Sequence, residues 1–268
     1  MKHVVFILGS YYPNYSAVGK CLGNIADVLS EEHRITVVCT KSFSEQEAYE
    51  AYNGQRIVRV LPRGMKHVVR YDERIRTSAG ARRMFARAIR QLLRMQGFVR
   101  TIISRETIRR GLVNAYVCAL QGLPEKIDVI VPTCLPFESV VAAMEFRSMQ
   151  PHVVLLPYLF DLFAGNLRLN RTPLNQRLKQ KRNMALERGM LASSKAVLHV
   201  SNWTAYFKEH FGEYAEKLIE VEHPLLVEQR QATTREDAET TYIVYTGVVD
   251  LKNRNPKNAL EQLRRLQG

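Results

Sequence analysis

Residues 3–40 contain three consecutive patterns: HVVFIL (3–8), GSYYPNYSAVG followed by KCLGNIADVLSE (9–31), and HRITVVCT (33–40). The first and last runs are short, apolar and rich in β-branched residues, which is typical of strands buried on both faces. The middle run starts as a loop and continues with apolar residues at helical spacing. This order predicts a parallel βαβ unit.

The same alternation continues along the chain. Strand-like runs recur at 56–61, 127–132, 152–157, 196–201, 218–222 and 242–246, and helical patterns lie at 18–30, 75–95, 97–121, 137–149, 172–193 and 202–211. We therefore predict an α/β fold with a doubly wound, mostly parallel, Rossmann-like sheet. In such a fold the ligand crevice lies beyond the carboxyl ends of the strands.

A change in composition predicts a domain boundary. Residues 226–240 are polar and lose all periodicity, so we expect a first domain over 1–225 followed by a linker over 226–240. Residues 241–268 supply one strand, one loop and one helix. A single βα unit cannot cover its own apolar faces, so we expect either a second domain of which only the start is present or a segment that packs back on the first domain.

Charge and composition indicate a cytoplasmic protein with one basic region. The 268 residues carry a net charge of +13, and residues 59–110 hold fifteen Lys or Arg against three Asp or Glu. The four cysteines are widely spaced, which is typical of reduced packing residues. No signal peptide or membrane span is apparent, so the basic region predicts an anionic partner at one surface.

The opening βαβ unit resembles that of family 4 glycosyltransferases, which have the GT-B fold. Four later stretches resemble the same family in the same order, and the resemblance spans the chain: PYLFDLFAGN (157–166), ERGMLASSKAVLHVSNWTAYFKEHFG (187–212), KLIEVEHPL (217–225) and YTGVVDLKNRNPKNALEQLRRL (245–266). Two departures stand out. The family's glycine pair is reduced to Ala17-Val18-Gly19, and Phe160 stands where some relatives have histidine.

The resemblance implies that residues 1–225 bind the acceptor and that 241–268 begin the donor-binding domain. A sugar would pass from a UDP- or GDP-sugar, without a metal ion and with retention of configuration. The acceptor would be a glycan or a polyprenyl-diphosphate-linked sugar in cell-surface polysaccharide synthesis. In the family the acidic E-x7-E element belongs further along the second domain, and this sequence stops before that point, so whether this chain is itself an active enzyme stays open.

Residues at the predicted strand ends are candidates for the site. Gly9, Ser10 and Gly19 frame a loop before a helix, where backbone N–H groups favour a phosphate or carboxylate; the alternative is a tight turn without a ligand. Asp161 follows an apolar strand and could orient the acceptor hydroxyl or accept its proton. It could equally cap the next turn.

By resemblance, Gly247, Lys252 and Arg254 belong to the donor loop, where the basic side chains would neutralise the leaving diphosphate. The alternative is a solvated loop. Glu187 matches a glutamate of the family, although a surface salt bridge is the default interpretation. Asn202 reads as a helix cap rather than a substrate ligand. The scattered histidines predict no metal site.

The basic region contains RRMFARAIRQLLRM (82–95), which places apolar side chains on one helical face among arginines. This pattern predicts a helix lying on an anionic membrane surface, so residues 59–110 would make the protein peripheral at the inner face of the cell membrane. The alternative is a helix that buries its apolar stripe in the core. Sparse aromatics and the lack of a nucleic-acid motif argue against nucleic acid as a partner.

One function from a different class remains open. A non-catalytic, truncated transferase acting as a glycan- or membrane-binding module would share the same fold and basic region.

Overall fold

The computed structural model describes residues 1–166, 172–224, 257, 261, 262 and 264. The chain divides into two compact units, Met1–Leu226 and Val227–Gly268. The predicted linker and second domain therefore lie almost wholly outside the described residues, as do Gly247, Lys252 and Arg254.

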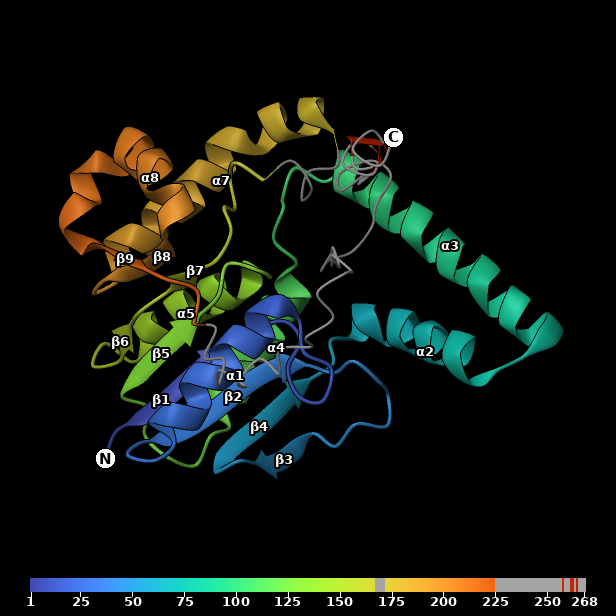
Figure 1. Ribbon diagram of the computed structural model, residues 1–268, viewed down its shortest axis with the longest axis horizontal. Helices are drawn as coiled ribbons and strands as arrows, with labels where there is room; N and C mark the ends of the chain where they lie inside the picture. The colour runs from blue at the N-terminus through green and yellow to red at the C-terminus, as the bar shows by residue number, and fades with distance from the viewer. Residues whose placement is uncertain (167–171, 225–256, 258–260, 263, 265–268) are drawn as a thin grey trace. The chain divides into compact units, whose positions relative to one another are not determined.

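The first unit is an α/β structure, and the predicted doubly wound, mostly parallel sheet is confirmed (Figure 1). Among the described residues, six strands pair in the order β3-β4-β2-β1-β5-β6 and three more in the order β7-β8-β9. A parallel bridge between Thr133 and Tyr158 links the two sheets. The strands are β1 (His3–Ile7), β2 (Arg34–Thr40), β3 (Tyr49–Tyr52), β4 (Gln55–Val60), β5 (Val129–Pro132), β6 (Val154–Leu155), β7 (Tyr158–Leu159), β8 (Val197–Val200) and β9 (Leu218–Val221).

Helices cover both faces of the larger sheet because its central strands are apolar on both sides. Val4, Phe6 and Leu8 pack in one core cluster with the helix α1, whereas Val5 and Ile7 pack in the other with α4 and α5. The helices are α1 (Ala17–Leu29), α2 (Arg63–Thr77), α3 (Gly80–Ile103), α4 (Arg110–Gln121), α5 (Glu138–Met149), α7 (Pro173–Ser193), α8 (Thr204–Phe211), and the 3₁₀ turns η1 (Ser201–Trp203) and η2 (Gly212–Lys217).

The helices of the basic region differ from the sequence prediction. A helix was expected over 75–95 and another over 97–121, but α2 begins at Arg63 after Pro62, and α3 runs through to Ile103. Ser78, which follows α2, is extended, and Gly80, the first residue of α3, has a φ of 55°. The break between α2 and α3 lies at these residues. The two helices form a hairpin (Figure 1).

Two smaller expectations need correction. Cys118 on α4 is exposed rather than a packing residue, although Cys21, Cys39 and Cys134 are buried. The short strands β3 and β7 were not predicted, and β3 pairs antiparallel to β4. Within the described residues, no helix is long and apolar enough to span a bilayer.

Candidate functional site at the carboxyl edge

The carboxyl ends of β1 and β5 meet where the strand order reverses, which is the usual ligand position in a doubly wound sheet. The N–H of Thr133 donates to the carbonyl of Ile7 at 3.0 Å, so the loops after the two strands start side by side. A Cβ on Gly9 would lie 3.2 Å from the Cδ of Pro136. Gly9 therefore permits the close approach of the loops that follow β1 and β5.

The loop after β1 also lies directly against the start of α1. Ser16 caps this helix, and its Oγ accepts the N–H of Gly19 at 3.0 Å. A side chain on Gly19 would overlap the carbonyl oxygen of Ser10, so only glycine fits this contact. The structure thus brings Gly9, Ser10 and Gly19 together, with the N–H of Gly19 engaged inside the loop.

Arg59, at the carboxyl end of β4, holds the outer part of this loop. Its guanidinium donates to the carbonyls of Tyr12 (2.9 Å) and Glu47 (3.2 Å), and it forms an ion pair with Glu50. Tyr12 also stacks on Tyr52 with ring centroids 3.8 Å apart. From the sequence, Arg59 was expected to belong to the basic surface, which is wrong because its side chain is buried. The sequence signal for this burial is the position of the arginine within the apolar strand run IVRV (57–60).

Asp161 lies at the same edge, directly after β7. Its N–H donates to the Sγ of Cys134 at 3.3 Å, which places it beside the end of β5, and the residue is partly buried. Burial raises the pKa of the Cys134 thiol to about 12, so this sulfur stays protonated at neutral pH and serves as an acceptor. The position of Asp161 at this edge is compatible with its predicted role, in which the carboxylate would orient or deprotonate a hydroxyl group.

Glu187 on α7 fixes the loop that carries Asp161. Its Oε1 accepts the N–H groups of Phe163 (3.2 Å) and Ala164 (3.0 Å), and its Oε2 accepts the hydroxyl of Tyr206 at 2.6 Å. Burial raises the pKa of this carboxyl, against these hydrogen bonds. The expected surface salt bridge is therefore wrong: Glu187 is buried and positions the Asp161 loop.

The strand-to-helix junction after β8 contributes less than the sequence suggested. Asn202 is exposed within η1 and caps no helix, because Trp203 occupies the cap position of α8. Trp203 instead donates its indole N–H to the carbonyl of Phe160 at 3.1 Å. The residue next to Asp161 is therefore held by an aromatic side chain that the sequence analysis did not single out.

Two surface hollows lie elsewhere, near the amino ends of the strands. One, of about 270 Å³, is lined by residues including Glu125, Lys126 and His152, just before β5 and β6. The other lies along β6 and includes Lys195 and Lys217. We place the candidate site at the carboxyl edge regardless of hollow size, because parallel strands gather their loops and helix starts there.

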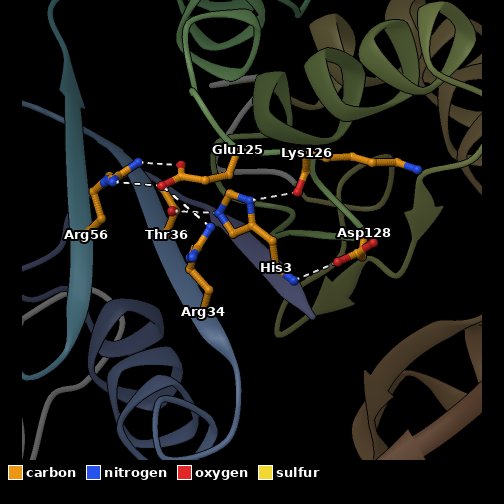
Figure 2. Close-up of polar contacts among 7 residues, drawn as sticks. All are labelled: His3, Arg34, Thr36, Arg56, Glu125, Lys126 and Asp128. Carbon is orange, nitrogen blue, oxygen red and sulfur yellow. Dashed lines mark hydrogen bonds and ion pairs between the residues drawn. The ribbon is translucent and has the colours of Figure 1, made fainter. Parts of the chain in front are cut away.

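A buried histidine organises this amino edge (Figure 2). The ring nitrogens of His3 contact the carbonyl of Lys126 (3.1 Å) and the hydroxyl of Thr36 (2.9 Å). The backbone N–H of His3 donates to the Asp128 carboxylate at 2.7 Å. Glu125 forms ion pairs with Arg34 and Arg56 next to this histidine. Burial, the largest influence, lowers the pKa of His3.

This histidine predicts a pH dependence of stability. A lowered pKa in the folded state means that the unfolded chain binds the proton more readily, so stability should fall as pH drops below the ordinary histidine value of about 6.5. Urea unfolding midpoints should decrease between about pH 7 and pH 5. The His3→Gln variant should show a flatter dependence in that window, whereas His152→Gln, which changes an exposed histidine, should keep the wild-type slope. Parallel slopes for wild type and His3→Gln would contradict this assignment.

Comparison with solved structures finds several carbohydrate-active proteins. They include sucrose-phosphate synthase from Thermosynechococcus elongatus (TM-score 0.49, 10% identity, 82% of this chain and 48% of that chain) and the catalytic domain of starch synthase IV from Arabidopsis thaliana (TM-score 0.48, 12% identity, 83% and 51%). A third is α,α-trehalose 6-phosphate synthase from Burkholderia multivorans (TM-score 0.42, 13% identity, 80% and 42%). The chain spans about half the length of these structures. No protein-family model and no curated protein sequence matches the chain.

Proposed function

We propose that this chain is the acceptor-binding part of a GT-B-type glycosyltransferase of cell-surface polysaccharide synthesis. The observation that carries the proposal is the meeting of the β1–α1 loop, the end of β5 and Asp161 at one carboxyl edge. The motif resemblance assigns the acceptor to this domain. A carboxylate at the strand edge fits an acceptor that presents a hydroxyl group, such as a glycan or a polyprenyl-diphosphate-linked sugar.

In the proposed reaction, the acceptor oxygen forms a bond to the anomeric carbon of a UDP- or GDP-sugar. The bond from that carbon to the diphosphate breaks, and the nucleoside diphosphate leaves. Asp161 orients the hydroxyl or takes its proton. By resemblance, Lys252 and Arg254, which follow Gly247 in the sequence, would neutralise the diphosphate, and positive charge there would stabilise the leaving group. The β1–α1 loop with Gly9, Ser10 and Gly19 would border the diphosphate.

Binding and turnover test the two halves of the proposal separately. Calorimetry of the full chain with UDP, GDP and their sugars should show saturable binding that Arg254→Ala weakens. With a donor that binds, release of nucleoside diphosphate in the presence of oligosaccharide acceptors should fall about 10²–10⁴-fold in Asp161→Asn, with donor affinity unchanged. Glu209→Gln, which alters an exposed carboxylate on α8, is the matched control.

No donor binding by the folded chain would contradict transfer by this polypeptide and favour the non-catalytic binding module. Donor binding with turnover unaffected by Asp161→Asn would remove Asp161 from the reaction.

A further inference from the structure

One face of helix α3 is covered by α2, and the opposite face is not covered by α2. Ala86 is buried, and Ile89 and Leu93 are partly buried one turn apart on the same side. Arg90, on that side as well, donates to Asp72 of α2 at 2.6 Å. This side of α3 is therefore its contact with the rest of the unit, and the opposite side faces outward.

The outward side of α3 is apolar and exposed along its length. We call it the outer face; it comprises eight large side chains whose exposed fractions run from 43% to 75%: Met84, Phe85, Leu92, Met95, Phe98, Val99, Ile102 and Ile103. Steps of three and four residues place most of them on one line of the helix. Contiguous exposed apolar surface of this kind marks an interaction site.

The end of α3 is anchored to α7. Asn175 and Lys179 of that helix donate to the carbonyl of Thr101 at 3.2 Å and 2.6 Å, in the last turn of α3. The anchoring means that the outer face is presented on a fixed support.

Positive charge borders the outer face along one flank. Arg83, Arg87 and Arg94 lie on that flank, four and seven residues apart, and all three are exposed. Arg82 and Arg100 are exposed as well, toward the two ends of the helix. The helix contains no Asp or Glu. Arginines in these positions can lay their apolar stems on a surface while the guanidinium groups reach its anionic rim.

We propose that the outer face docks onto an anionic lipid bilayer, with α3 lying in the plane of the interface. An apolar line flanked by basic residues on a helix too polar to span the membrane fits this position. A second copy of the chain fits less well, since two outer faces in contact would bring their arginines together. This docking does not depend on the proposed sugar transfer.

Vesicle co-sedimentation of the full chain tests the proposal. We compare phosphatidylcholine vesicles with vesicles in which phosphatidylglycerol makes up about a third of the lipid; the chain should bind the anionic vesicles at least about tenfold more tightly, and added salt should weaken binding. The pair Leu92→Gln/Met95→Gln should weaken binding about tenfold or more, and Arg87→Gln/Arg94→Gln should remove the preference for anionic lipid. All four side chains are exposed, so folding should be retained, which circular dichroism checks.

Val28→Gln/Met149→Gln is the matched control, because it removes similarly exposed apolar side chains from α1 and α5. Wild-type vesicle binding by this control, together with the two losses above, would support the proposal. Equal binding to neutral and anionic vesicles, no binding by the folded chain, or binding unchanged by Leu92→Gln/Met95→Gln would overturn it. Concentration-dependent dimers in light scattering that Leu92→Gln/Met95→Gln abolishes would instead assign the outer face to self-association.

Discussion

Glu187→Leu is expected to lower the free energy of unfolding by about 3–5 kcal/mol, because it leaves two buried backbone N–H donors without an acceptor, at about 1–3 kcal/mol each. Those donors belong to Phe163 and Ala164, and the Tyr206 hydroxyl loses its carboxylate partner and keeps only the Sδ of Met184. Leucine is similar in size to glutamate, so a cavity contributes little. Urea unfolding of the full chain measures the loss.

Glu187→Gln separates hydrogen bonding from charge. The amide oxygen can still accept both N–H groups, and its NH₂ can donate to Tyr206, so stability should stay within about 1 kcal/mol of wild type at neutral pH. Because burial raises the pKa of Glu187 in the folded state, the contribution of the glutamate to the free energy of unfolding falls as pH rises through that raised pKa. Glutamine does not titrate, so the stability of Glu187→Gln relative to wild type should increase with pH.

The same pair of variants reports on the site. Amide hydrogen exchange at Phe163 and Ala164 should become much faster in Glu187→Leu and remain near wild type in Glu187→Gln. With a working transfer assay, Glu187→Leu should also lose activity through the displaced Asp161 loop. If leucine is tolerated within about 1 kcal/mol, these hydrogen bonds do not hold the loop.

Regular patterns made the sheet predictable. The runs at β1, β2, β4 and β8 are apolar enough to be buried on both faces, and α1 follows with helical spacing, so the order of elements required no tertiary information. Strands β3 and β7 have four and two residues, and no residue of β3 is fully buried. Their pairing depends on partners distant in sequence, which local periodicity does not encode.

The candidate site was predictable only in part, for a similar reason. The edge position of Asp161 and of the first loop follows from strand ends in a parallel sheet. The groups that hold the loop of Asp161, Glu187 and Trp203, come from later elements, and their roles depend on burial. One signal was present: Asn175, Lys179, Asn183 and Glu187 recur every four residues on α7, and all four are buried. A polar line at that spacing indicates an inward-facing side that makes specific hydrogen bonds.

Arg59→Met should lower the free energy of unfolding by about 3 kcal/mol, the lower end of the range for breaking a buried ion pair. The arginine side chain is 1% exposed whereas Glu50 is 37% exposed, so the abandoned carboxylate can recover water but the two carbonyls that Arg59 binds are less able to. Urea unfolding tests this against Arg56→Met on the same strand. Arg56 is 40% exposed in its pair with Glu125, so its loss should stay below about 1 kcal/mol.

Arg56 lies near the amino end of β4 and Arg59 near its carboxyl end, so hydrogen exchange at the two edges of the sheet gives a second test of the prediction. Arg59 holds the loop after β1 through the carbonyl of Tyr12, so hydrogen exchange over residues 11–16 should increase in Arg59→Met and stay unchanged in Arg56→Met. Arg59→Lys should behave like the methionine variant, because a single ammonium group cannot reproduce the forked contacts to Tyr12, Glu47 and Glu50. Equal losses of stability for Arg59→Met and Arg56→Met would contradict this prediction, because burial would then not set the value of these ion pairs.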